Sequence, residues 1–153
     1  MGYVPPNAKW YLAEIVQHIQ VEGDTRNVVH TNVVLVRADS PEEAYERAVE
    51  LGIAAEGSYE NPEGNRVTCT YRGLRDLNVI HDDLEHGTEL IYSEQTDMDE
   101  RAIQQWISPK EELGIFAPMK PSNGPDYRAG DVVRELYERL RNSDADKETG
   151  PER

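Results

Sequence analysis

Two long runs of β-branched and aromatic residues, at positions 9–21 and 28–37, are the feature that most constrains this fold. Neither run contains Pro or Gly, and side chains of this kind favour extended strands. The residues between the runs, EGDTRN at 22–27, are rich in turn formers. The pattern therefore predicts two long strands joined as an antiparallel hairpin.

A helix is predicted directly after this hairpin, at residues 41–51. Ser40 is a good cap for a first helical turn, Pro41 suits the first helical position, and Glu43 completes a capping box. Apolar residues then recur on one side, and Gly52 follows as a stop signal. This helix is expected to pack its apolar side on the hairpin.

Two further strands and a short helix are predicted beyond it. Residues 66–71 alternate apolar and polar side chains, and residues 88–94 (TELIYSE) also resemble a strand. Residues 98–107 predict an amphipathic helix that buries Ala102, Ile103, Trp106 and Ile107. The expected fold is α+β: an antiparallel sheet of about four strands in the order β-β-α-β-β, with one main helix on one face and short C-terminal helices.

The length of 153 residues fits one domain. We expect that domain to cover residues 1–116, followed by a Pro- and Gly-rich linker at 117–130. An amphipathic helix is predicted at 131–141, with an apolar stripe that needs a docking surface in the same molecule or on a partner. Residues 142–153 lack large apolar side chains, so a disordered tail is expected.

The charge of the chain limits its partners. Asp and Glu number 30 against 16 Lys and Arg, which gives a formal net charge of −14. Such a surface repels phosphate backbones and anionic lipid headgroups, so nucleic acid and membranes are not expected partners. Cys69 is the only cysteine, and the sequence shows no signal peptide or apolar run of membrane-spanning length. A cytoplasmic location is therefore predicted.

Several segments together resemble the bacterial family known as domain of unknown function 4288. The matching stretches are WYLAE at 10–14, ADSPEEAYERAVELG at 38–52, SYENPEGNRV at 58–67 and GLRDLNVIHDDLEHGTELIY at 73–92. The resemblance runs from about residue 10 to residue 94. It implies a shared fold, and the family brings no established activity, cofactor or site residue.

The first hairpin also supplies a candidate binding surface. Side chains alternate between the two faces of a strand, and Glu14, His18, His30 and Asn32 all occupy even positions. If even positions pair with even positions, these polar groups share one face with several apolar neighbours. That face is interpreted either as an ordinary solvated surface, as a contact with a subunit or partner, or as a ligand or metal site. A register shift by one residue would separate the group.

A second polar cluster follows at 81–86 and consists of His81, Asp82, Asp83 and His86, with Glu85 between them. Carboxylates and imidazoles are suitable ligands for divalent metals, but the same residues are common in solvated turns. No phosphate-binding loop, dinucleotide fingerprint, zinc spacing or nucleophile elbow is present. No catalytic residue, cofactor or bound metal is therefore predicted.

These features together predict a module for protein–protein interaction or self-association, with a homodimer expected. The orphan stripe at 131–141 and the apolar residues on both hairpin faces support this prediction. Two alternatives remain open. One is a small-molecule or metal-binding domain with a minor enzymatic role, and the other is an acidic inhibitor or immunity-type protein for a basic partner.

Overall fold

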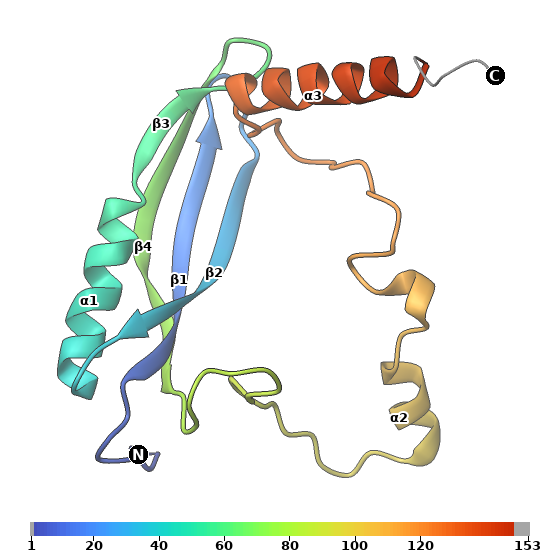
Figure 1. Ribbon diagram of the computed structural model, residues 1–153. Helices are drawn as coiled ribbons and strands as arrows, with labels where there is room; N and C mark the ends of the chain where they lie inside the picture. Colours follow the sequence, from blue (N-terminus) through green and yellow to red (C-terminus); the bar gives the residue numbers. More distant parts are fainter. Residues whose placement is uncertain (1, 149–153) are drawn as a thin grey trace.

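The computed structural model describes residues 2–148, which form a four-stranded antiparallel sheet with a long helix against it (Figure 1). The strands are β1 (Trp10–Val21), β2 (Asn27–Arg37), β3 (Gly57–Glu60) and β4 (Arg66–Val79). The helix, α1 (Pro41–Ala54), lies between β2 and β3 in the chain. In space the strand order is β2-β1-β4-β3. The α+β fold with the element order β-β-α-β-β is confirmed.

The strand predicted at 66–71 is the first part of β4, whereas β3 lies where no strand was predicted. β3 occupies residues 57–60, and β4 continues eight residues past the strand predicted at 66–71. Two bulges opposite β1 and a φ of 137° at Gly73 let β4 continue where the apolar alternation fails. Residues 88–94 form no strand, because the chain has left the sheet there and nearly all of them are exposed.

Helix α1 begins as predicted but ends later. The Ser40 side chain accepts a hydrogen bond of 3.2 Å from the backbone N–H of Glu43, which caps the first turn. The helix then passes through Gly52 and ends at Ala54. Gly52 is buried against Tyr71, where an added Cβ would lie 2.4 Å from ring carbons. Gly52 therefore allows the helix to approach β4 closely, and it is not the stop signal.

Odd positions of β1 pair with even positions of β2, as in Ala13 with Val34 and Tyr11 with Val36. The condition for a shared polar face, that even positions pair with even positions, is therefore not met. β2 has apolar residues at both odd and even positions, so its own sequence does not define which face is buried. The burial of Val34 and Val36 beneath α1 selects the observed register. We call the α1 side of the sheet the helix face and the other side the open face.

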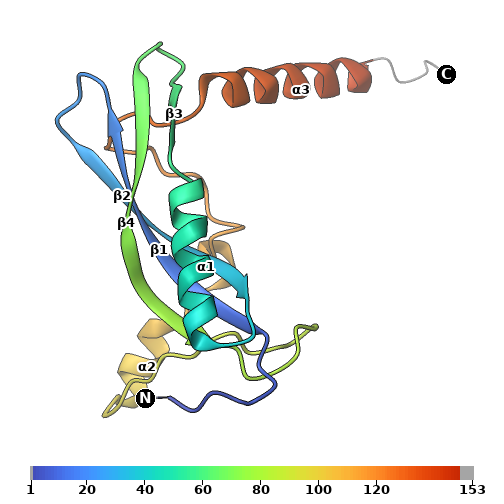
Figure 2. The same cartoon turned by 90° about the vertical axis from the view of Figure 1, so that its left-hand side faces the viewer.

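Two apolar clusters cover the helix face. The larger one joins α1 to the middle and lower parts of the sheet through Tyr11, Ala13, Ile15, Val36, Ala38, Ala44 and Ala48. The smaller one lies near the β1–β2 turn, where Ile19, Val21 and Val67 pack with Tyr127 from the C-terminal part of the chain. Figure 2 shows α1 lying along the front of the sheet. The helix face therefore has two separate covers.

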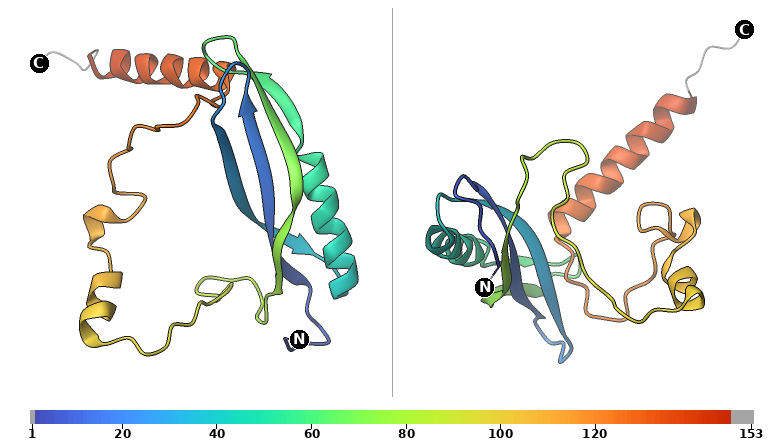
Figure 3. Two further views of the ribbon diagram at one scale, coloured as in Figure 1. Left: turned by 180° about the vertical axis from the view of Figure 1, so that it is seen from behind. Right: turned by 90° about the horizontal axis from the view of Figure 1, so that it is seen from below.

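Residues 81–121, which we call the arm, run apart from the sheet and contain no buried residue (Figures 1 and 3). The arm includes α2 (Glu100–Trp106) and the single 3₁₀ turn η1 (Lys110–Glu112). A helix at the position of α2 was predicted, but its predicted apolar stripe is not buried. Ile103, Trp106 and Ile107 are 43%, 56% and 70% exposed, because α2 lies apart from the sheet in the described part of the chain (Figure 1).

The chain returns to the sheet before its last helix, α3 (Gly130–Glu148). Pro125 is buried and Tyr127 packs at the β1–β2 end of the helix face, so this part of the predicted linker contacts the sheet. α3 contains the helix predicted at 131–141 and continues through 142–148, where a tail was expected. The end of that tail, 149–153, lies outside the described residues. None of the described helices has the length and apolar character needed to span a membrane.

Candidate interaction surface

The register separates the four polar residues that the sequence placed on one face. Glu14 and His18 lie on the open face, whereas His30 and Asn32 lie on the helix face. Directly paired residues of adjacent strands lie on the same face, and here even positions of β1 pair with odd positions of β2. The four side chains therefore do not converge, and each pair has its own surroundings.

The open-face pair is held by neighbours in the sheet. Glu14 lies 3.6 Å from the guanidinium of Arg75, a residue that bulges out of β4. The Nε2 atom of His18 lies 2.9 Å from the side-chain amide nitrogen of Asn27, at the start of β2. These contacts fix both side chains along the sheet, which is a structural use of their polar groups.

The helix-face pair lies between the two apolar clusters. The Asn32 amide donates a hydrogen bond of 3.2 Å to Gln17, which is only 8% exposed. The His30 ring meets Tyr127 edge to face, with ring centroids 5.2 Å apart. Gln17 thus has a partner in place, as a buried amide requires. Asn32 thus joins β2 to β1, and His30 joins β2 to the returning chain at Tyr127.

The second cluster, His81, Asp82, Asp83 and His86, lies in an exposed turn at the start of the arm. Thr88 closes this turn: its hydroxyl donates to the Asp83 carbonyl at 2.5 Å and accepts from the Glu85 N–H at 2.9 Å. His81 stacks on Tyr3, with ring centroids 6.3 Å apart. Within residues 2–148, no three His, Cys, Asp or Glu side chains are arranged to hold a metal.

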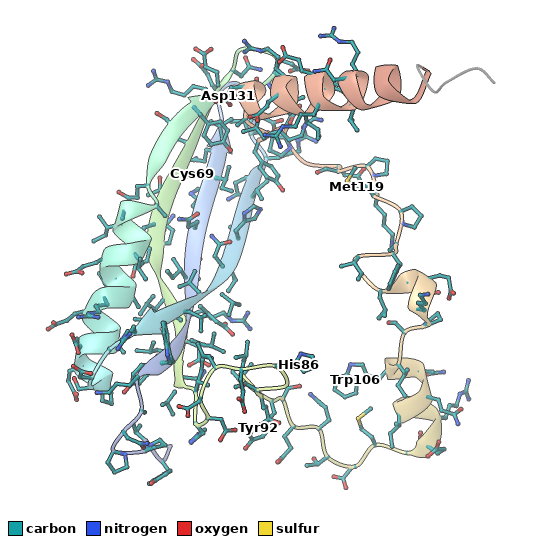
Figure 4. All side chains as sticks on the ribbon, viewed as in Figure 1. Cys69, His86, Tyr92, Trp106, Met119 and Asp131 are labelled. Atoms are coloured by element: carbon teal, nitrogen blue, oxygen red, sulfur yellow. The ribbon has the colours of Figure 1, made fainter. Side chains whose placement is uncertain are left out.

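Cys69 lies within the sheet (Figure 4), on the helix face beside Tyr59. Burial raises the pKa of its thiol, and the hydrogen bond with Tyr59 offsets only part of that effect. A raised pKa keeps the sulfur protonated near neutral pH, whereas nucleophilic cysteines need the thiolate. Cys69 therefore acts as a packing residue, as its alternation with Val67 and Tyr71 suggests.

The most unusual surface is one that the sequence did not single out, the outer edge and open face of β2. β2 is an edge strand of 11 residues, and Val29, Val33 and Leu35 are 57%, 60% and 46% exposed. Residues 27–36 contain no Pro, Lys, Arg, Asp or Glu, which are the residues that usually protect an edge from pairing. The sequence did indicate this surface, because residues 28–37 have apolar side chains at odd positions as well as at even ones.

An arginine side chain forms a hydrogen bond at each end of β2. At one end Arg47 of α1 donates a hydrogen bond of 2.6 Å to the Arg37 carbonyl. At the other end Arg26 donates one of 2.5 Å to the Asn123 carbonyl of the returning chain. The backbone between them forms no hydrogen bond beyond the β1 ladder within the described part of the chain. We call residues 27–37 of this strand, with their free edge and open-face side chains, the β2 surface.

Comparison with known proteins gives one match. The family model described as Domain of unknown function (DUF4288) matches residues 10–93, from the start of β1 into the arm, which is more than half of the chain. The resemblance proposed over residues 10–94 is thereby confirmed. Neither the curated proteins nor the solved structures contain a match to this chain.

Proposed function

The chain belongs to the family described as Domain of unknown function (DUF4288), and because that description names no activity, we propose a function from the geometry. The protein is a self-associating interaction module that uses the β2 surface. The observation that carries this proposal is the 11-residue edge strand with exposed Val29, Val33 and Leu35 and no protecting charge or Pro at 27–36. Unpaired edge backbone and apolar side chains favour the addition of a strand.

The partner that fits this surface is a second copy of the same strand. In a two-fold pairing centred on Asn32, antiparallel β2 strands set Val29 opposite Leu35 of the second copy and Thr31 opposite Val33. Each cross-strand pair of this kind stabilises a sheet by roughly 0.2–1 kcal/mol. The two exposed apolar patches then merge on one side of an eight-stranded sheet, so the surface complements itself.

We place this homodimer in the cytoplasm. Cys69 is the only cysteine, so the described fold relies on no intrachain disulfide, which suits a reducing compartment. The net charge of −14 disfavours contact with nucleic acid and supports a protein partner.

Light scattering after size-exclusion chromatography tests the proposal. The expected mass is twice the 17.4 kDa of one chain. Val33→Lys places a charge within the merged patch and is expected to weaken the dimer at least about tenfold, or about 1.4 kcal/mol. The matched control is Tyr45→Lys, because Tyr45 on α1 is 57% exposed and Val33 is 60% exposed. A monomer at every concentration, or equal effects of the two variants, would contradict the proposal.

A further inference from the structure

The arm is the longest stretch of the described chain without a buried residue, although it is rich in large apolar side chains. Those that are exposed are Leu84, Leu90, Ile91, Tyr92, Ile103, Trp106, Ile107, Leu113, Ile115, Phe116 and Met119. Exposed apolar side chains in such number mark an interaction surface. Ordering a segment of this length also costs conformational entropy, which is offset only when its side chains are buried. The apolar side chains of the arm can therefore be buried only against a surface that lies outside residues 81–121.

Both ends of the arm are fixed to the sheet, at opposite ends of it. At the first end the N–H of the buried Ile80 donates a hydrogen bond of 2.9 Å to the Trp10 carbonyl. At the second end Pro125 and Tyr127 pack beside the β1–β2 turn. The 41 residues at 81–121 reach about 130 Å when extended, whereas β1 is about 40 Å long. The arm is thus long enough to pass well beyond the edge of its own sheet.

The position of the arm points to the β2 surface. Figures 1 and 3 show the arm on the β2 side of the sheet, away from α1. In Figure 4 the Trp106 ring extends from α2 toward the sheet. A second copy that pairs along β2 occupies this same side. The arm then lies beside the second copy rather than in solvent.

The charges favour the open face over the rest of the molecule. Between residues 81 and 121 Asp and Glu outnumber Lys and Arg by ten to three. The outer side of α1 is acidic as well, with Glu42, Glu46 and Glu50, and therefore repels the arm. On the open face the cations Arg37 and Arg75 accompany the carboxylates Glu14 and Asp76, and residues 27–36 carry no carboxylate. The open face of β1 and β2 is thus the sheet surface that an acidic, apolar arm approaches most easily.

We propose that the arm of each copy crosses the paired β2 strands and covers the open face of the second copy. The inference rests on the proposed self-association and adds to it a reciprocal exchange of arms. The apolar side chains of α2 and of residues 113–119 then contact Val29, Val33 and Leu35 of the second copy. The arm thereby gains the buried surface that it lacks within its own chain, and the open face gains a cover.

Cross-linking between two differently tagged single-cysteine chains tests the exchange. Both chains carry Cys69→Ser, one carries Ile107→Cys in the arm, and the other carries Val33→Cys on β2. The chains are unfolded together, refolded as a mixture, and treated with a flexible bis-maleimide. Ile107 and Val33 are 70% and 60% exposed, so both thiols are accessible before association. Circular dichroism and a melting temperature verify the fold of each variant first.

The expected product is a covalent pair of the two tagged chains, formed several-fold more than with the control Tyr45→Cys in place of Val33→Cys. A chain with both Ile107→Cys and Val33→Cys, diluted below the dimer concentration, is expected to give little internal cross-link. A predominant internal cross-link, or yields equal to the control, would overturn the arm exchange. Cross-links between two Val33→Cys chains report on the β2 pairing separately, so the failure of one proposal is distinguishable from that of the other.

Discussion

Close contact between Gly52 and Tyr71 determines how α1 lies on the sheet. A Cβ built at Gly52 would lie 2.4 Å from two ring carbons of Tyr71, a distance that Cβ atoms do not tolerate. In a helix interior, replacing Gly by Ala ordinarily stabilises by about 1 kcal/mol, because Gly loses more backbone entropy. At this position overlap with the ring opposes that gain. The balance between the two effects is measurable.

Gly52→Ala is expected to lower the free energy of unfolding by about 1–3 kcal/mol, since the ring must leave its position or the helix must shift. Urea denaturation followed by circular dichroism measures this. In a Tyr71→Ala background the same substitution is expected to cost much less or to stabilise, because the obstructing ring is gone. Equal losses in both backgrounds would show that Tyr71 is not the cause.

The four polar residues of the hairpin show why the candidate site was only partly predictable. The sequence places Glu14, His18, His30 and Asn32 at even positions, but the face that each occupies depends on the pairing across the turn. A run such as VVHTNVVLVR has apolar residues at both parities, so its own pattern does not define a buried side. The contact with α1 decides the register, and that contact is not local in sequence.

The elements themselves were easier to predict where local chemistry determines them. The two strands of the hairpin and the start of α1 follow from composition and from the cap at Ser40. Residues 88–94 also contain strand-forming side chains, yet no neighbouring strand pairs with them in the described part of the chain. A strand requires a partner as well as a pattern, because its backbone groups must form hydrogen bonds. The bulges that extend β4 depend on β1 and have no local signal.

The contact of the C-terminal segment with the sheet depends on the turn between β3 and β4. The buried amide of Asn61 donates a hydrogen bond of 2.9 Å to the Asp126 carbonyl and accepts two from the N–H groups of Glu63 and Asn65. The Tyr59 hydroxyl donates one to the Tyr127 carbonyl. The residues at 61–64 (NPEG) are typical of a turn, and in the structure this turn also holds residues 122–130.

Tyr59→Phe is expected to release this segment, because the hydrogen bond to Tyr127 contributes about 1 kcal/mol. Hydrogen exchange should become faster in residues 122–130 and remain unchanged in β1. The control is Tyr92→Phe, because Tyr92 is 73% exposed in the arm. Unchanged exchange in 122–130 would mean that the apolar contacts of Tyr127 hold the segment without help from Tyr59.

High pH provides a second test of the same contact. Burial raises the pKa of the Tyr59 hydroxyl above its ordinary value of 10.0. A group with a raised pKa in the folded state contributes stability that is present below its unfolded pKa and is lost as the pH rises through the folded pKa. The segment at 122–130 is therefore expected to loosen above about pH 10, and Tyr59→Phe should remove that pH dependence. Hydrogen exchange across this range measures the effect, and an identical profile in both proteins would contradict it.

The net charge of the whole molecule opposes self-association, whereas the uncharged β2 surface favours it. Each copy carries a net charge of −14, so two copies repel one another at a distance. The β2 surface has no charged residue between 27 and 36, and its pairing relies on apolar contact and backbone hydrogen bonds. Local pairs between the arm and Arg37 or Arg75 are exposed, and such pairs contribute about 0–1 kcal/mol. Repulsion between whole chains therefore dominates the electrostatics of association.

Salt is accordingly expected to strengthen the dimer. The Debye length falls from about 30 Å at 0.01 M salt to about 8 Å at 0.15 M, which removes most of the repulsion between the two bodies. Sedimentation equilibrium should show the dissociation constant decreasing as salt is raised over this range, with Val33→Lys remaining the weaker associator throughout. A basic partner held by the acidic surface would behave in the opposite way, because screening weakens attraction between unlike charges. A dissociation constant that increases with salt would therefore contradict pairing through the neutral β2 surface and favour an inhibitor-type role.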